Sequence, residues 1–208
     1  MADKNTPAAR VAKVIRVITA PPFMIALLII FLTANGFFSS QRDAAAAWLG
    51  LVILPVASYP VHRAVPSLYK TGREGQRKLA FVFTLIGYTL CFVYSFFSES
   101  QEARFLFSVY FATALILTLV NKLLHIRASG HTASSVSPCV FALMYLSLGT
   151  FIFFAAMFLI SVWASLYLKR HKLTDVFAGV CSFFAAFGAC FLFRSGFLCS
   201  KVVVLLFL

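Results

Sequence analysis

The sequence predicts an all-α protein, a polytopic transmembrane helical bundle of about six to seven spans. Hydrophobic residues make up 62% of the 208 residues and charged residues only 12%, and the mean hydropathy is +0.94. These values are far from those of a soluble domain. The apolar residues form long uncharged runs without the alternation of β-strands. Backbone groups in lipid must be satisfied within each segment, so such runs favour helices over a barrel.

Seven apolar runs are candidate membrane-spanning helices. About 20 residues are needed to cross a hydrocarbon core, and the length of each run is compared with that number. Residues 132–168 are too many for one crossing, so a hairpin with a tight turn near Gly149 is expected. Pro21 and Pro22 suit the first turn of a helix, and Pro55 is expected to kink the second span. The chain ends in seven apolar residues, too few to cross, which are expected to lie along the membrane or pack on the bundle. The candidate spans are residues 17–41, 44–61, 79–98, 105–121, 132–150, 151–168 and 173–193.

No internal repeat, linker or soluble domain separates these runs, so residues 1–208 are expected to form a single integral membrane domain, multi-pass and in the cell membrane. Lys and Arg are concentrated in alternate connections, which predicts a cytoplasmic N-terminus and, with an odd number of spans, an external C-terminus. The basic residues lie between apolar runs rather than along one polar face. The net charge of +12 therefore indicates anionic phospholipid headgroups, rather than nucleic acid, as partners.

Two clusters of basic and imidazole-bearing residues lie at the borders of these spans. The first cluster covers residues 121–137 and the second covers residues 169–175. In the predicted orientation, both clusters and the basic loop of residues 62–78 lie on the same side of the membrane. The clusters can therefore form one site for the anionic headgroup of a lipid. Their candidate residues are Lys122, Arg127, Ser129, Gly130, His131, His171 and Asp175.

The histidines are the candidate reactive groups. Asp175 is the last carboxylate of the chain and lies four residues after His171. On one helical turn the carboxylate would accept from one ring nitrogen of His171 and leave the other as a nucleophile or base. A helix cap at the start of the last span is the alternative role of Asp175. His131 follows Ser129 and Gly130 at an expected helix N-terminus, which favours a bound anion, although Ser129 there also suits an ordinary cap.

Basic residues of the first cluster are the candidate phosphate ligands. Arg127 can grip two phosphate oxygens at once, and Lys122 can act as a point charge. Residues of the positive-inside border have the same composition, so this alternative stays open. The five cysteines lie in apolar surroundings without a CxxC pair or neighbouring histidines. They predict small apolar side chains rather than disulfides or a metal site, and no cofactor is expected.

Taken together, the clusters resemble the type 2 phosphatidic acid phosphatase family, whose members carry the motifs KxxxxxxRP, PSGH and SRxxxxxHxxxD. The second motif corresponds to ASGH at residues 128–131, and the third to residues 164–175, where the HxxxD end matches in full. The resemblance covers about residues 105–193, including the hairpin between the two histidines. Ala128 replaces the proline of PSGH, and Ala164 and Ser165 stand where the family has Ser-Arg.

The first motif is reduced to Lys122 with Arg127 at a shorter spacing. The arginine absent from the third motif is expected to be supplied by Arg73, Arg77 or Arg170. The site of many family members is on the side away from the cytoplasm, whereas the charge count here favours the cytoplasmic side.

The resemblance implies metal-independent hydrolysis of a lipid phosphomonoester or diphosphate, with phosphatidic acid or an isoprenoid phosphate or diphosphate as substrate. His171 would attack phosphorus and form a phosphohistidine, Asp175 would orient it, and His131 would protonate the leaving alkoxide. Lys122, Arg127 and the amides after Ser129 would hold the phosphate oxygens.

Two other functions stay open. A catalytically silent membrane protein of the same fold would bind or move anionic lipids, and the absent motif arginine favours this alternative. A small transporter is the weaker one, because the interiors of the spans contain no charged residue outside the two clusters that would mark a pathway.

Overall fold

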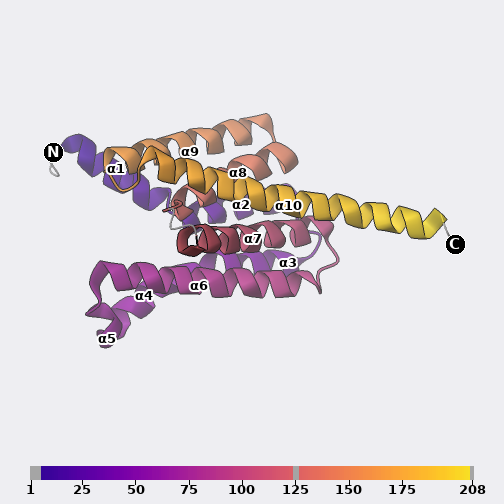
Figure 1. Ribbon diagram of the computed structural model, residues 1–208, viewed down its shortest axis with the longest axis horizontal. Helices are drawn as coiled ribbons and strands as arrows, with labels where there is room; N and C mark the ends of the chain where they lie inside the picture. The colour runs from indigo at the N-terminus through magenta and orange to yellow at the C-terminus, as the bar shows by residue number, and fades with distance from the viewer. Residues whose placement is uncertain (1–5, 124–126, 207–208) are drawn as a thin grey trace.

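The computed structural model describes residues 6–123 and 127–206, with side chains described up to residue 194. Within these ranges every regular element is a helix, which confirms the predicted all-α bundle (Figure 1). The elements are α1 (Pro7–Ile18), α2 (Pro21–Ala34), α3 (Gln41–Ala47), the π-helical η1 (Trp48–Ile53), α4 (Leu54–Ala64), α5 (Pro66–Tyr69), α6 (Gly72–Ser95), α7 (Gln101–Leu123), α8 (Gly130–Tyr145), α9 (Leu148–Tyr167) and α10 (Leu173–Leu206).

The bundle has the dimensions of an integral membrane protein. Five helical segments are each long and apolar enough to cross a membrane, and the bent pair of α1 and α2 adds a sixth. The α8 helix has only 16 residues and is about 24 Å long, shorter than a hydrocarbon core of about 30 Å. It pairs with α9 in the predicted hairpin, but the turn lies at Leu146 and Ser147 rather than at Gly149, which is in the first turn of α9. Ser147 caps α9 by accepting from the backbone N–H of Thr150 at 3.2 Å.

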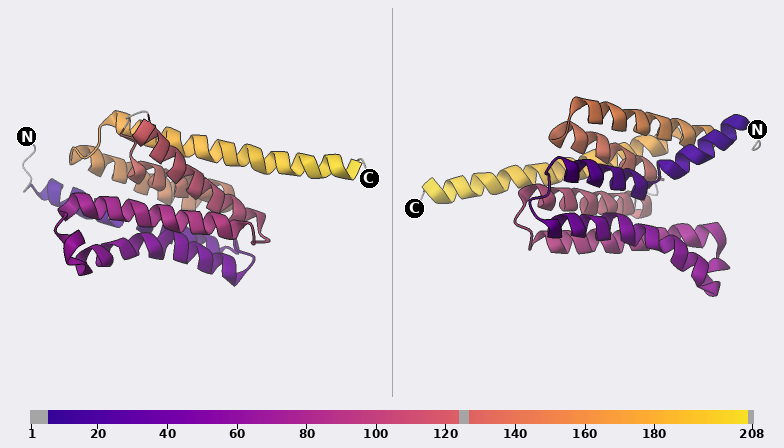
Figure 2. Two further views of the ribbon diagram at one scale, coloured as in Figure 1. Left: turned by 60° about the horizontal axis from the view of Figure 1, so that its bottom comes forward. Right: turned by 180° about the vertical axis from the view of Figure 1, so that it is seen from behind.

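The first span is bent rather than straight. Its two halves, α1 and α2, meet at 53°, as the view from behind shows (Figure 2). Pro21 and Pro22 occupy the first turn of α2, as predicted. A residue before proline avoids the helical conformation, and Ala20 is accordingly extended with ψ 146°. The bend lets α1 pack against α9, which brings the last turn of α1 to the second cluster.

The second span changes its helical winding just before Pro55. The chain from Gln41 to Ala64 is one continuous helical span, in which the π-helical segment η1 lies directly before α4. Pro55, in the first turn of α4, has no N–H to donate into the preceding turn. A wider π-helical turn at this position is the structural response to the missing donor.

The second and third spans cross at two glycines. A Cβ atom on Gly87 of α6 would lie 2.1 Å from the carbonyl oxygen of Gly50, and one on Gly50 would lie 2.3 Å from Sγ of Cys91. Small residues at a crossing allow two helix backbones to approach closely. This contact fixes α6 against η1 and thereby sets the position of the basic start of α6.

We expect Gly87→Ala to destabilise the protein by about 1–3 kcal/mol, because the added methyl group overpacks a backbone contact. Gly188→Ala is the matched control, since a Cβ atom there meets nothing within 4 Å. Thermal unfolding in detergent measures the difference. Equal midpoints for the two variants would contradict the close crossing.

The interior combines aliphatic side chains, many of them from α2, with aromatic side chains mainly from α7, α8 and α9. Phe107, Phe141 and Phe154 are fully buried, and the ring of Tyr110 stacks on Phe141 while its hydroxyl group lies 2.9 Å from Oγ of Ser137. Many large apolar side chains on the outward faces are exposed, as expected where lipid rather than water surrounds the bundle. The apolar tail is not a separate segment, because α10 continues to Leu206 and extends past the other helices (Figure 1).

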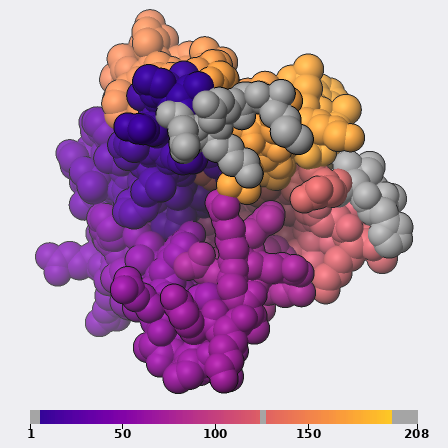
Figure 3. Space-filling view, turned by 90° about the vertical axis from the view of Figure 1, so that its left-hand side faces the viewer, coloured from indigo at the N-terminus to yellow at the C-terminus, as the bar shows by residue number. Residues whose placement is uncertain are grey.

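The two polar clusters lie at the same end of the bundle, as the sequence predicts. Figure 3 views this end, where α1, the region of α5 and the start of α6, the segment before α8 and the connection from α9 to α10 come together. These elements come from four distant parts of the chain. Any site at this end is therefore assembled from all of them.

Candidate functional site

The first cluster is joined directly to the second through the backbone. The N–H of Ser129 donates to the carbonyl oxygen of Asp175 at 2.9 Å. A Cβ atom on Gly179 would lie 2.5 Å from the carbonyl oxygen of Ser129, so only glycine permits this approach of α10. Ser129 also caps α8, because its Oγ accepts from the N–H of Thr132 at 3.3 Å. These contacts hold His131, in the first turn of α8, beside His171.

The structure shows the capping role of Asp175, but not the predicted hydrogen bond from His171. Its Oδ2 accepts from the backbone N–H of Lys172 at 3.0 Å, which satisfies a free amide at the start of α10. The same oxygen lies 3.5 Å from Nδ1 of His171. This contact is electrostatic rather than an aligned hydrogen bond. His171 lies in the turn before α10 and not on a shared helical turn with Asp175, but Nε2 still faces away from the carboxylate.

His131 contacts the bend of the first span. Its Nε2 lies 3.4 Å from Oγ1 of Thr19, and Thr19 also lies 3.2 Å from Oγ of Ser161 and donates to the carbonyl oxygen of Ile15 at 2.8 Å. Thr19 and Ser161 are both buried. The bend between α1 and α2 thus determines where this imidazole ring lies.

Arg16 is the site residue that sequence reasoning did not identify. It lies three residues before Thr19, so both side chains share one face of α1. Its charge acts on His131 and on His171. Nη1 of Arg16 is buried and has no hydrogen-bond partner in the described part of the chain. In the sequence this arginine is only one of the basic residues that predict a cytoplasmic N-terminus, and no local motif distinguishes it from Arg10 or Lys13.

Three further arginines lie within electrostatic range of Arg16. The guanidinium groups of Arg73, Arg77 and Arg170 all act electrostatically on it, and we call these four residues the arginine cluster. Each of the three had been predicted as a possible replacement for the absent motif arginine. The carboxylate nearest to them along the chain, Glu74, lies 2.9 Å from Nζ of Lys78. Glu74 also interacts with Arg77, so it compensates only part of the positive charge of the arginine cluster.

The surroundings keep both imidazoles neutral. Burial, followed by the charge of Arg16 and the charge that His171 carries when protonated, lowers the pKa of His131 to about 3. Burial and Arg16 lower the pKa of His171, Asp175 opposes this shift, and Arg77 adds to it. A neutral His171 has a lone pair on Nε2 and can act as a nucleophile. An anion beside His131 and Arg16 would oppose the lowering and favour a protonated His131 ring.

Two predicted phosphate ligands are not brought to the histidines. Lys122 is exposed in the last turn of α7, and Arg127 is exposed just before α8. Neither has an ion pair or hydrogen bond to His131 or His171 in the described ranges. Gly130 begins α8 and is exposed, whereas Ser129 is fully buried. Arg16 therefore takes the position beside the histidines for which Lys122 and Arg127 were predicted.

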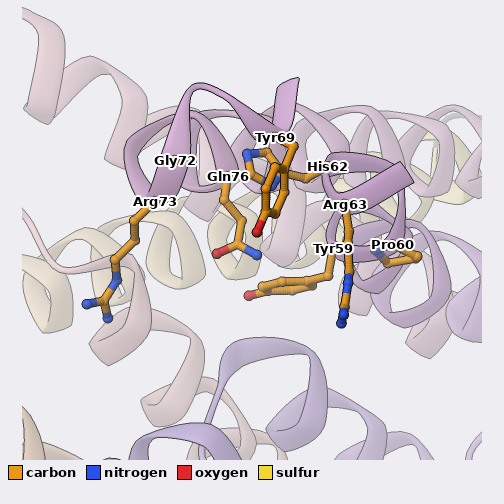
Figure 4. Close-up of a pocket in the computed structure, with 8 residues that line it drawn as sticks. All are labelled: Tyr59, Pro60, His62, Arg63, Tyr69, Gly72, Arg73 and Gln76. Carbon is orange, nitrogen blue, oxygen red and sulfur yellow. The ribbon is translucent and has the colours of Figure 1, made fainter. Parts of the chain in front are cut away.

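A cavity of about 790 Å³ opens beside the arginine cluster, between α4, α5 and the start of α6. Arg73 lies at one end of the cavity and Arg63 at the other (Figure 4). No carboxylate lines it, so its polar lining consists of neutral or cationic groups. The remaining lining residues are Tyr59, Pro60, His62, Tyr69, Gly72 and Gln76.

The turn that presents Arg170 and His171 contains a strained residue. The N–H groups of Arg170 and Lys169 donate to the carbonyl oxygens of Ser165 and Leu166 at 3.0 and 2.9 Å, the pattern of a Schellman motif. Lys169 has φ 51°, which costs about 1–2 kcal/mol for a residue with a Cβ atom.

We expect Lys169→Gly to stabilise the protein by about 1 kcal/mol, because glycine adopts positive φ without that cost. Lys169→Ala removes the same charge but keeps the Cβ atom, so it should not stabilise. Thermal unfolding of both variants tests the prediction, and an equal gain from alanine would contradict it.

Comparison with known proteins finds no matching family model, no similar curated protein and no similar solved structure. Among the residues that the structure describes, no three His, Cys, Asp or Glu side chains gather as a metal site requires.

Proposed function

We propose that this protein is a membrane-embedded lipid phosphate phosphatase that uses His171 as its nucleophile. The observation that carries the proposal is the convergence of His131, His171 and Arg16 from three parts of the chain. A buried guanidinium nitrogen without a partner is costly. A phosphate group bound between Arg16 and the two imidazoles would satisfy it.

Each group has a role in this mechanism. Nε2 of neutral His171 attacks phosphorus, and Asp175 orients the ring and stabilises the positive charge that develops on it. Arg16 binds the equatorial oxygens, where its charge counts most in the transition state. His131, protonated once the anion is bound, gives its proton to the leaving oxygen. Water then hydrolyses the phosphohistidine and regenerates His171.

The substrate class follows from the location of the site. The site lies at one end of a bundle whose outer surface is apolar, so a substrate with a lipid chain and an anionic headgroup reaches it from the membrane. Phosphatidic acid and isoprenoid phosphates or diphosphates have this form. In this proposal the protein works in the cell membrane.

Phosphate release by the detergent-purified protein tests the proposal. The panel contains phosphatidic acid, an isoprenyl phosphate and an isoprenyl diphosphate, each assayed with a chelator and without added metal. We expect release from at least one of them. No release by protein that circular dichroism shows to be folded would contradict it and favour the lipid-binding alternative, which binding to vesicles with anionic lipid would then measure.

A further inference from the structure

We propose that Thr19 is a positioning residue that determines which ring nitrogen of His131 carries the proton, so that Nε2–H is held by Thr19 and Nδ1 exchanges a proton with the substrate. The part that His131 plays in the reaction rests on the proposed function. The position of the proton rests on contacts alone. These contacts join the end of α1, the first turn of α8 and Ser161 of α9.

The hydroxyl group of Thr19 has one proton to donate, and two acceptors lie closer to it than His131 does. The carbonyl oxygen of Ile15 lies 2.8 Å from Oγ1, Oγ of Ser161 lies 3.2 Å away, and Nε2 of His131 lies 3.4 Å away. Both nearer groups are placed to accept from Thr19, and a carbonyl oxygen can only accept. The proton of Thr19 therefore points away from the imidazole, and Oγ1 offers the ring a lone pair.

A lone pair on Oγ1 selects one tautomer of the ring. In a neutral imidazole one nitrogen donates and the other accepts, and the hydrogen bond that one nitrogen makes determines where the proton lies. Nε2 must donate to Thr19, so Nδ1 holds the lone pair. Among the described residues Nδ1 has no hydrogen-bond partner, which leaves this nitrogen for a bound ligand.

Both partners of this hydrogen bond are held by backbone contacts. The N–H and the hydroxyl group of Thr19 each donate to the carbonyl oxygen of Ile15 at 2.8 Å, and Thr19 is 1% exposed at the bend (Figure 2). His131 lies in the first turn of α8, where Ser129 donates its N–H to the carbonyl oxygen of Asp175 at 2.9 Å. The contact therefore restricts the rotation of the ring as well as its protonation.

In the proposed reaction the second proton of His131 is bound at Nδ1. Nδ1 gives this proton to the leaving oxygen as the P–O bond breaks, and the ring returns to its neutral Nε2–H form. When water then attacks the phosphohistidine, its oxygen bonds to phosphorus, the P–N bond to His171 breaks, and one proton of the water returns to Nδ1. Nε2–H stays on Thr19 throughout, so Thr19 acts only through His131.

Nitrogen NMR of protein with isotope-labelled histidine, in detergent and without substrate, locates the proton. The chemical shift of a ring nitrogen differs strongly with and without its proton, and His131→Gln assigns the signals of His131 among the four histidines. Near neutral pH we expect only the Nε2–H form of His131 in the wild type and in Thr19→Ser. Thr19→Val keeps the shape of threonine but cannot accept, so we expect a mixture of both neutral forms.

Thr71→Val is the matched control for this measurement. Oγ1 of Thr71 lies 3.4 Å from Nε2 of His62 and donates to the carbonyl oxygen of Leu68, so the same arrangement occurs at a histidine outside the proposed reaction. This variant should change the signals of His62 and leave those of His131 as they are. A predominant Nδ1–H form of His131 in the wild type, or signals of His131 that Thr19→Val does not change, would overturn the inference.

Kinetics of two substrates test what the position of the proton does in the reaction. A lipid phosphomonoester leaves as an alkoxide and needs a proton from an acid, whereas p-nitrophenyl phosphate leaves as a stabilised phenolate and needs none. Thr19→Val should lower kcat/KM for the lipid by about ten- to a hundredfold, and that for p-nitrophenyl phosphate by less than about threefold. Thr19→Ser should keep the lipid activity within about threefold of the wild type, because it restores the acceptor.

The outcomes separate this inference from the proposed function. Equal losses for the two substrates in Thr19→Val would overturn the positioning role, because damage to the fold lowers both rates alike, and the phosphatase function would stand. A folded wild type that hydrolyses neither substrate would overturn the proposed function. The NMR spectrum of that same protein would still decide where the proton of His131 lies.

Discussion

Replacement of His171 by glutamine is expected to lower kcat/KM for phosphate release by at least about 10⁴-fold, because loss of a catalytic nucleophile removes most of the rate enhancement. Glutamine keeps a polar side chain of similar reach but cannot form the phosphohistidine. The imidazole is half-buried, and Asp175 at 3.5 Å also caps α10 through Lys172, so the helix start should survive the change. Initial rates on the best substrate of the panel measure the effect.

His62→Gln is the matched control for this loss. His62 lies at the same end of the bundle and is 5% exposed, and its Nε2 lies 3.4 Å from Oγ1 of Thr71. That distance equals the one between His131 and Thr19. His62 lines the same cavity as Arg73, but it is not among the groups whose charge acts on His131 or His171. We expect its variant to keep wild-type activity within a few-fold. More than about 1% of wild-type activity in the His171→Gln variant would exclude His171 as the nucleophile.

Replacement of Arg16 by glutamine is expected to lower kcat/KM by about 10²–10³-fold, the usual effect of removing one preorganised group that stabilises transition-state charge. Arg16→Lys should recover part of this, since lysine restores the charge without the two-pronged geometry. Arg10→Gln is the matched control, because Arg10 lies on the same helix but is exposed. Equal activities of the Arg10 and Arg16 variants would contradict a role of Arg16 in binding phosphate.

The pH profile of the Arg16 variant separates an electrostatic role from a structural one. Attack requires neutral His171, and its pKa in the folded protein is lowered by burial, Arg16 and Arg77 despite the opposing Asp175. The acid limb of wild-type kcat/KM should therefore lie at a pH below 6.5, the ordinary pKa of histidine. Loss of the Arg16 charge raises that pKa, so the acid limb of the variant should move to higher pH. A limb that does not move, or moves to lower pH, would contradict the electrostatic role.

Much of the architecture could be predicted because its causes are local. Apolar runs between basic connections require helices in lipid, and they predicted the α8–α9 hairpin as well as the meeting of both clusters at one end. Ser129 at the start of α8 and Asp175 at the start of α10 follow from capping chemistry, which acts within three residues. The predicted span of residues 17–41 matches the structure less well, because the first span consists of two halves, α1 and α2, that meet at a bend. A hydropathy pattern contains no information about a bend angle.

The candidate site divides in the same way. Imidazole, carboxylate and serine spacing are properties of short segments, so His131, His171, Asp175 and Ser129 could be selected from the chain, and the structure brings them together. The position of Arg16 beside these residues depends on the bend at Pro21 and on the packing of α1 against α9, contacts between residues more than a hundred positions apart. Lys122 and Arg127 carry the expected charges close to His131 in sequence, but the end of α7 leaves both exposed. Local sequence patterns thus determined which residues are the reactive groups. Long-range packing determined that Arg16, rather than Lys122 or Arg127, supplies the positive charge beside them, and no short segment encodes that packing.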